Sequence, residues 1–392
     1  MESDPFDRFT VAVLSGRIPS MPRCSLLALV LCCSLVLTGC GDQPGPTASA
    51  GEKPVLNIYN WSDYIAPDTI ANFERETGIA VNYDVFDSNE VLEAKLLAGT
   101  TGYDIVVPSA NFVRRQLEAG LFRPLDRETL PNYAHLDPAI LAALTAHDPD
   151  NRHVVPYLWG TTGIGYNVAA VAERLPDAPL GSWDLLFDPE VVAQLADCGV
   201  ALVDAPSEVF PAALHYLGLP VDTAAPNEIA AAEALLMQVR PYIRYFHSSQ
   251  YINDLANGEI CVAFGWNGDV FIARDRAREA GNGVEVAYFI PREGAIMWFD
   301  VMAIPRDAPH PDNAHRFIDY ILRPAVTAAL SNHVNYANAN LAATPLVDPT
   351  VTGDPAIYPD AATMRMLFPA VSASAEHDRL VTRAWTRIKT GH

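Results

Sequence analysis

Aromatic and acidic residues follow several segments of the chain that have the composition of β-strands. In open α/β sheets, ligands bind beyond the carboxyl ends of the strands, so such residues are candidates for one shared site. A carboxylate accepts charge-assisted hydrogen bonds from an ammonium group, and an aromatic ring attracts the cation and packs on its methylene groups. Several carboxylates and rings in one cleft would therefore suit an organic polycation. The candidates are Trp61, Ser62, Asp63, Tyr64, Ser109, Glu208, Trp266, Asp269, Trp298, Asp300 and Tyr336.

Each candidate also has a plainer interpretation. A single Trp or Tyr after a strand more often packs in the core, and a single Asp in a loop more often forms a turn or caps a helix. Asp63 could cap the helix that starts near Pro67, and Asp269 could cap the segment 270–278. The prediction of a site therefore depends on the convergence of the whole set and not on any one position.

Several classes of function are disfavoured by what the sequence lacks. It contains no G-x-S-x-G nucleophile elbow, no H-E-x-x-H zinc motif and no G-x-x-x-x-G-K-[ST] phosphate loop. The glycines at 160–165 lack dinucleotide-binding spacing, and no Cys and His residues have metal-site spacing. The net charge of −21 argues against nucleic acid and anionic membranes as partners. We therefore predict a binding protein, not an enzyme, with no cofactor and no metal.

Alternating strand-like and helix-like segments would position the candidates. Asp87 and Glu90 have the spacing of a capping box, and Gly78, Gly99 and Gly120 are placed to end helices. This alternation predicts a mostly parallel sheet covered by helices. The expected strands are 55–59, 80–86 and 103–107, and the expected helices are 68–77, 87–99 and 111–119.

A second unit of the same kind follows, with strand-like segments at 199–203, 260–264 and 284–290 and a helix at 228–239. The stretch 156–167 is rich in glycine and aromatic residues, which indicates a crossing between the two units. We predict an α/β fold of two lobes joined by crossing strands, with a hinged cleft between them. The predicted boundaries are a signal peptide at 1–39, a flexible tether at 40–53, a first lobe at 54–157 and 284–330, and a second lobe at 158–283 and 331–392.

The N-terminus has the features of an export signal. Arg23 precedes an apolar run over 26–37 that is too short to span a bilayer and that ends in small residues. The residues Leu-Thr-Gly-Cys at 37–40 resemble a bacterial lipobox, in which Cys40 carries the lipid, and Met21 would be the translation start. An ordinary signal peptide cleaved nearby is the alternative. We predict a periplasmic protein that is lipid-anchored through Cys40.

Export also changes how the cysteines are interpreted. Cys198 and Cys261 would remain after processing and would lie in an oxidising compartment, where a disulfide is the default expectation. Closing a loop of that length would contribute about 4 kcal/mol in the chain-entropy model. Two buried free thiols are the alternative interpretation.

Four stretches carry a resemblance to a known family: 59–67 (YNWSDYIAP), 84–90 (DVFDSNE), 161–167 (TTGIGYN) and 244–256 (RYFHSSQYINDLA). At these residues the sequence resembles the bacterial periplasmic polyamine-binding proteins of ABC importers, and most of all their putrescine-binding type. The resemblance extends from Leu56 to Lys389. It implies the type II periplasmic binding fold, in which two lobes close on a ligand held between them.

The resemblance also implies a role for each candidate. Carried over position by position, Ser62 and Asp63 grip one amine end of the ligand and Ser109 lines the same region. The implied anionic contacts are Glu208, Asp269 and Asp300, and the implied aromatic walls are Trp61, Tyr64, Trp266, Trp298 and Tyr336. Cys198 and Cys261 fall where relatives carry paired cysteines.

The implied function is capture of spermidine or putrescine and delivery to an ABC permease in the inner membrane, by a monomer that binds no nucleic acid. A polyamine sensor that signals without transport is the alternative. Two positions depart from the pattern. At Trp298, putrescine-preferring relatives have Phe and spermidine-preferring relatives have Trp. Asn267 stands where a small residue is expected. A wider indole would stack on a longer ligand. We therefore hypothesise that this protein prefers spermidine, or binds both polyamines comparably.

Overall fold

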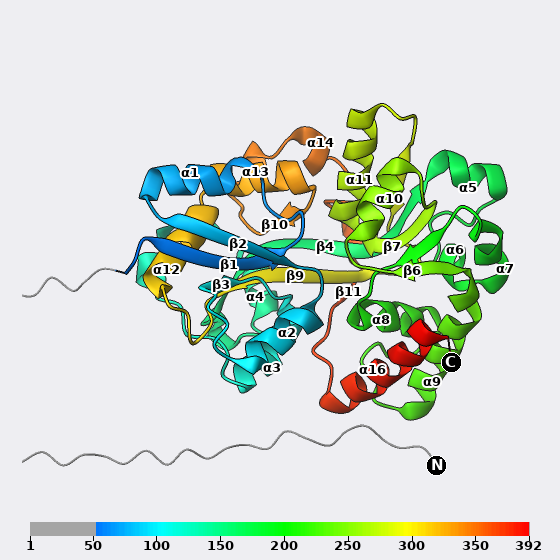
Figure 1. Ribbon diagram of the computed structural model, residues 1–392, viewed down its shortest axis with the longest axis horizontal. Coiled ribbons are helices and arrows are strands. Elements are labelled where there is room, and N and C mark those ends of the chain that lie inside the picture. The colour runs from blue at the N-terminus through cyan, green and yellow to red at the C-terminus, as the bar shows by residue number, and fades with distance from the viewer. Residues whose placement is uncertain (1–51, 392) are drawn as a thin grey trace, which may run out of the picture. The chain divides into compact units, whose positions relative to one another are not determined.

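The computed structural model describes residues 52–391 (Figure 1). The predicted signal peptide, the lipobox with Cys40 and nearly all of the predicted tether lie outside the described residues. Within them, no helix combines the length and the apolar character that crossing a membrane would need.

The described residues form one mixed sheet of eleven strands with helices on both faces. The main path runs in the order β2-β1-β3-β9-β4-β7-β5-β6, with β8 and β10 paired to β4 and β11 paired to β9. The strands are β1 (Val55–Trp61), β2 (Ala80–Phe86), β3 (Ile105–Val106), β4 (Val154–Asn167), β5 (Val200–Leu202), β6 (Ile243–Phe246), β7 (Val262–Trp266), β8 (Val286–Phe289), β9 (Ile296–Ala303), β10 (Ala337–Asn338) and β11 (Phe368–Pro369).

Two parallel groups of strands lie at opposite ends of this sheet. In the first group, β1 pairs in parallel with β2 and β3. In the second group, β5 pairs in parallel with β6 and β7. The predicted parallel arrangement is therefore confirmed within each group, and the α/β class is confirmed for the chain. The strand predicted at 284–290 is β8, which pairs antiparallel with β4 and so lies outside the parallel group.

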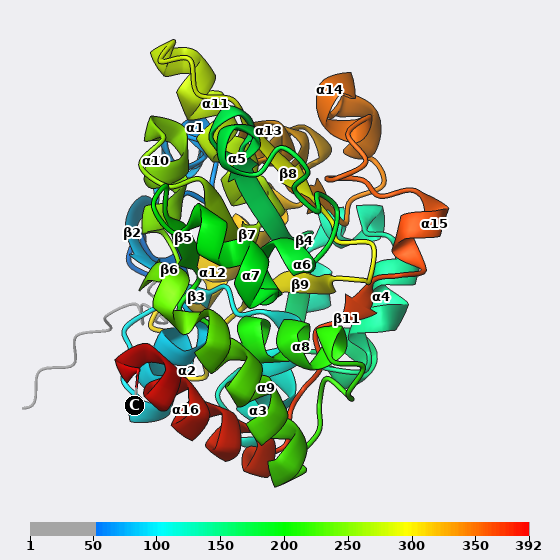
Figure 2. The ribbon, with the colours of Figure 1, turned by 90° about the vertical axis from the view of Figure 1, so that its right-hand side faces the viewer.

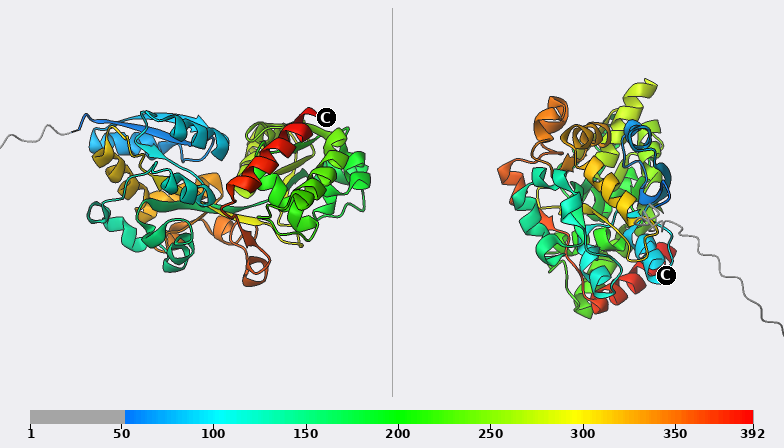
Figure 3. Two further views of the ribbon diagram at one scale, coloured as in Figure 1. Left: turned by 90° about the horizontal axis from the view of Figure 1, so that it is seen from below. Right: turned by 90° about the vertical axis from the view of Figure 1, so that its left-hand side faces the viewer.

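Two antiparallel strands connect the groups (Figure 3). β4 pairs with β9 over 154–162 and with β7 over 162–166, while β9 reaches β3 through Ala303. The predicted crossing at 156–167 thus lies within β4. Its glycines have a packing reason, because a Cβ at Gly160 would come within 2.9 Å of the Trp298 ring. The lobe boundaries proposed above stay a prediction.

Helices cover both faces of each group. Around the first group, α1 and α13 lie on one face and α2 and α3 on the other (Figure 1). Around the second group, α10 and α11 lie on one face, and α8, α9 and α16 pack together on the other (Figure 2). The longer helices are α1 (Asp68–Thr77), α2 (Asn89–Ala98), α3 (Ala110–Glu118), α8 (Pro206–Tyr216), α9 (Pro226–Val239), α10 (Gln250–Asn257), α11 (Asn267–Ala280), α12 (Pro311–Ile321), α13 (Pro324–Val334) and α16 (Ala375–Thr390).

Short helices fill the connections. They are α4 (Pro138–Leu144), α5 (Val168–Arg174), α6 (Asp184–Phe187), α7 (Pro189–Val192), α14 (Pro349–Thr352) and α15 (Ala361–Met364).

Local sequence signals set most helix ends. α1 ends where predicted, because Gly78 takes a left-handed conformation with φ of 71°. The predicted start of α2 at Asp87 is wrong. Ser88 is the N-cap instead, and its hydroxyl accepts a hydrogen bond from the backbone N–H of Val91 at 3.2 Å. Asp87 is thereby left in the loop between β2 and α2.

The disulfide between Cys198 and Cys261 is present, with a Cα–Cα distance of 5.5 Å. Cys198 lies just before β5 and Cys261 just before β7, which are neighbouring parallel strands. The bond therefore ties their N-terminal ends together, and the opposite ends of both strands remain free to present side chains.

Candidate ligand-binding site

A pocket lies where the C-terminal ends of the two parallel groups face each other across β9. It contains about 580 Å³ of space that protein atoms do not fill, counting the part open to solvent. This volume is in the usual range for small-molecule sites, roughly 300–1,000 Å³. Ten of the eleven predicted residues line the pocket, and only Asp63 of that predicted set does not. The ten are Trp61, Ser62, Tyr64, Ser109, Glu208, Trp266, Asp269, Trp298, Asp300 and Tyr336.

Asp269 is held by two tyrosines. It lies in the first turn of α11 and is only 7% exposed. The Tyr336 hydroxyl donates a hydrogen bond to one carboxylate oxygen at 2.8 Å, and the Tyr251 hydroxyl donates to the other at 2.9 Å. Burial raises the pKa of Asp269 to about 7, although both tyrosine hydrogen bonds act in the opposite direction.

Asp300 is held by a chain of polar groups from the first strand group. The Ser109 hydroxyl donates to its carboxylate at 2.6 Å, and the Asn89 amide donates to the Ser109 oxygen at 2.9 Å. Ser109 and Asp300 face each other because their backbones form an antiparallel bridge between the end of β3 and β9. Burial raises the pKa of Asp300 to about 7. The Tyr64 hydroxyl is buried beside Asp300, and burial together with the Asp300 carboxylate raises the pKa of Tyr64.

Glu208 comes from the second strand group, in the first turn of α8. The Thr162 hydroxyl donates to its carboxylate at 2.6 Å, and the indole N–H of Trp298 donates to the Thr162 oxygen at 3.1 Å. Burial, followed by the nearby Asp300 and Glu90, raises the pKa of Glu208 to about 8.

The charge of the lining has one sign. Within residues 52–391, five carboxyl groups line the pocket, from Asp87, Glu90, Glu208, Asp269 and Asp300, and no Lys, Arg or His lines it. Four of these groups, all except Asp87, have raised pKa values because burial removes water that would stabilise the anion. A cation entering the pocket would return that stabilisation, so the site favours positive ligands.

Aromatic rings form the walls between these carboxyl groups. Trp61 and Trp266 meet edge to face with ring centroids 5.6 Å apart. Tyr336 meets Tyr64 at 5.2 Å and Trp298 at 5.3 Å in the same manner. Such ring faces can pack on methylene groups and attract ammonium groups by cation–π interaction. The walls and the carboxyl groups together suit a flexible organic cation.

Asp63 lies outside the pocket lining. It has a left-handed backbone with φ of 54°, and its side chain is exposed. Its carboxylate pairs with Arg276 of α11 at 2.7 Å. Because this contact already neutralises Asp63, its predicted grip on an amine end stays a prediction.

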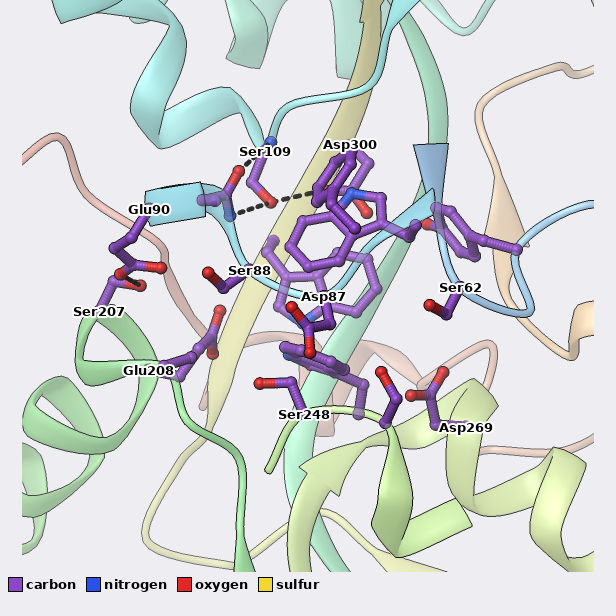
Figure 4. A pocket seen from close by; sticks show the side chains of 18 of the residues that line it. Ser62, Asp87, Ser88, Glu90, Ser109, Ser207, Glu208, Ser248, Asp269 and Asp300 are labelled. Carbon is purple, nitrogen blue, oxygen red and sulfur yellow. Dashed lines mark hydrogen bonds between the residues drawn. The ribbon is translucent and has the colours of Figure 1, made fainter. Parts of the chain in front are cut away.

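Several lining residues are not among those predicted from the sequence. Asp87, Ser88, Asn89 and Glu90 come from the loop after β2 and the first turn of α2, and Ser207 and Ser248 come from the second group (Figure 4). The rule that ligands bind beyond strand ends could have found the loop after β2. Tyr251 holds Asp269 from within α10, and no local signal marks it.

This chain resembles known proteins over most of its length. The family model described as bacterial extracellular solute-binding protein matches residues 68–359. The chain is 57% identical to the putrescine-binding periplasmic protein PotF of Escherichia coli, over 87% of this chain and 93% of that protein. It is 50% identical to the putrescine-binding periplasmic protein SpuD of Pseudomonas aeruginosa, over 91% and 97%.

A solved structure shows the same fold. It is the spermidine/putrescine ABC transporter substrate-binding protein PotD of Streptococcus pneumoniae, with a TM-score of 0.68 and 28% identity over 86% of this chain and 99% of that chain. The long sequence matches and the shared fold cover nearly all of the described residues. The chain therefore belongs to the family of bacterial extracellular solute-binding proteins.

Proposed function

We propose that this protein captures a polyamine, spermidine or putrescine or both, outside the cytoplasm and delivers it to an ABC importer. The observation that carries the proposal is a pocket that, in the part of the chain the structure describes, is lined by five carboxyl groups and several aromatic rings and by no basic side chain. Relatives at 57% and 50% identity are named as putrescine-binding periplasmic proteins, which supports the same ligand class. The protein is not an enzyme, since its family binds solutes and does not transform them.

Capture follows from closure of two lobes. The carboxyl groups come from both strand groups: Asp87 and Glu90 from the first, Glu208 and Asp269 from the second. Only a closed arrangement lets both groups touch one ligand, so the ligand favours closure by its differential affinity for that state. The lobes are those predicted from the sequence, with the division at residues 54–157, 158–283, 284–330 and 331–392.

The partners and location follow from the same role. The closed protein docks as a monomer on a permease in the inner membrane, and it binds no nucleic acid because its net charge is −21. It is periplasmic, with a lipid anchor at Cys40. A sensor role is less favoured, since the solved relative is named as part of an ABC transporter.

The identity of the ligand depends on Trp298. Its indole is 5% exposed, packs on Tyr336 and donates to Thr162, which is hydrogen-bonded to Glu208. The indole therefore connects two of the anionic positions along the pocket wall. This arrangement supports the hypothesis that spermidine binds better than putrescine or as well as it.

A thermal-unfolding panel on ligand-stripped protein tests the function. The ligands are putrescine, cadaverine, spermidine, spermine, arginine and glutamate. A ligand at about 1,000 times its Kd should add about 4 kcal/mol of stability, which is a shift of several degrees in Tm. A shift confined to the polyamines supports the proposal, and no shift with any polyamine refutes it.

A further inference from the structure

An ion pair joins the two strand groups on the face of the sheet that carries α3 and α16 (Figure 1). The Arg115 guanidinium of α3 donates a hydrogen bond to the Asp378 carboxylate of α16 at 2.6 Å. α3 covers the first strand group, whereas α16 packs on α8 and α9 of the second. Neither residue lines the pocket described above, so the pair is separate from the candidate ligand site.

The first strand group holds Arg115 in position. Two nitrogens of its guanidinium donate to the two carboxylate oxygens of Glu93 on α2, at 2.6 and 2.8 Å. The guanidinium also stacks on the Phe112 ring, 4.1 Å from the ring centroid. Because these contacts already order the side chain, little further entropy is lost when Arg115 contacts Asp378.

The second strand group holds Asp378 in the same way. Asp378 lies in the first turn of α16, where the helix dipole favours a carboxylate. The helix is fastened to Asp204, just after β5, by the Lys389 ammonium at 2.9 Å and by the Trp385 indole N–H at 2.7 Å. α16 would therefore move with the second group, and the pair with Arg115 would break if the two groups separated.

The charges around the pair make Arg115 important for closure. Arg115, Glu93 and Asp378 line a hollow between α2, α3, α8 and α16, and Arg115 is the only Lys or Arg in this lining within residues 52–391. Without Arg115, the Glu93 carboxylate of the first group would face the Asp378 carboxylate of the second. Like charges repel, so this arrangement would oppose closure.

Resting on the proposed polyamine function, we propose that the Arg115–Asp378 pair strengthens polyamine binding by stabilising the closed arrangement, without touching the ligand. Isolated surface ion pairs contribute little, but an arginine that binds one carboxylate through two nitrogens within a network contributes measurably. The observed affinity of a protein that binds in one state scales with the fraction of molecules in that state. Arg115 and Asp378 are thus positioning residues, and loss of their contact lowers the affinity for every polyamine by a common factor.

Calorimetric titration and stopped-flow release measurements on the full chain, with putrescine and spermidine, test this role. Asp378→Asn should weaken binding of each ligand about 3- to 10-fold and leave their affinity ratio within about 2-fold. The loss should appear as faster release, because the pair forms only on closure. Glu376→Gln is the matched control, since Glu376 also lies in the first turn of α16 but pairs with Arg379 of the same helix at 3.3 Å. It should leave both affinities unchanged.

Arg115→Gln provides a second readout through a double-mutant cycle. In that background, Asp378→Asn should not weaken binding further, because the contact is already lost. Single-molecule energy transfer between one dye on each strand group measures the closed fraction of the ligand-free protein. Arg115→Gln and Asp378→Asn should each lower that fraction, which a purely structural role of these residues would leave unchanged.

Three results would overturn the role of the pair. They are unchanged affinities in Asp378→Asn, a loss that differs by more than about 3-fold between the two polyamines, and an equal loss in the Arg115→Gln background. If the unsubstituted protein binds neither polyamine, the proposed function fails instead, and the closed fraction still tests the ion pair. Thermal unfolding of the ligand-free variants checks that each has folded.

Discussion

Replacing Asp269 with Asn separates ligand binding from folding at one residue. The two side chains have nearly the same shape, and the Tyr251 and Tyr336 hydroxyls that contact Asp269 can still hydrogen-bond to an amide. An ammonium group in the pocket would lose its carboxylate partner. Truncating one partner of a buried charge pair costs about 2–5 kcal/mol, so polyamine affinity should fall by a factor of about 30 to 4,000.

In the absence of ligand, the same substitution should not lower the free energy of unfolding. Asp269 has a pKa of about 7 in the folded chain against an ordinary value of 3.8, so its ionisation opposes folding. The difference of about 3 in pKa, at about 1.36 kcal/mol for each, amounts to about 4 kcal/mol at pH 8. The stability that the protonated group supplies is complete below pH 3.8 and is lost as the pH rises through 7. Ligand-free Asp269→Asn should therefore be at least as stable as the parent at pH 8.

Calorimetric titration with putrescine and spermidine, together with thermal unfolding at pH 5 and pH 8, measures both effects. Asp275→Asn is the control, because Asp275 lies on the same helix outside the pocket lining and pairs with Arg274 at 3.0 Å. The control should keep its polyamine affinity. Unchanged affinity in Asp269→Asn would refute the ligand role. A loss of affinity accompanied by a large fall in ligand-free stability would show that the residue is structural.

Three further predictions follow from the same structure. Polyamine affinity should rise from pH 5.5 to pH 8, and binding should release protons, because the three carboxyl groups with pKa raised to about 7 or 8 must ionise to bind a cation. Calorimetric titration in buffers of different ionisation enthalpy measures the number of protons released. Binding without proton release at pH 6 would contradict this prediction. Gly268→Ala should weaken polyamine binding at least about 10-fold, because a Cβ there would displace the Tyr336 ring that positions Asp269. An unchanged affinity in calorimetric titration would contradict this prediction. Cys198→Ser with Cys261→Ser should lower stability by about 2–4 kcal/mol in denaturant unfolding and leave affinity within about 3-fold, since the bond lies at the strand ends away from the pocket.

The fold class was predictable because it depends on local patterns. The alternation of strand and helix signals located α1 to the residue, since Gly78 provides a left-handed stop. The start of α2 was misplaced by two residues, because Ser88 and Asp87 are both good caps and only the backbone geometry selects Ser88. The antiparallel direction of β4 and β9 was not predictable, since no residue type encodes which strand a long segment will pair with.

The sequence by itself determined which residue types stand after the strands, and therefore the anionic and aromatic character of the site. Trp61 and Trp266 are the last residues of β1 and β7, and Asp269 lies in the first turn of the helix that follows β7. The rule that ligands bind at such strand ends needs only local sequence signals. Only the tertiary structure decided which carboxylates face the pocket. Asp63 pairs with Arg276, whereas Glu90 lines the pocket and accepts a hydrogen bond from Ser207. The physical reason is that burial and ion pairing depend on residues far apart in the chain. The residues adjacent to a carboxylate in the sequence do not indicate which distant residues will surround it.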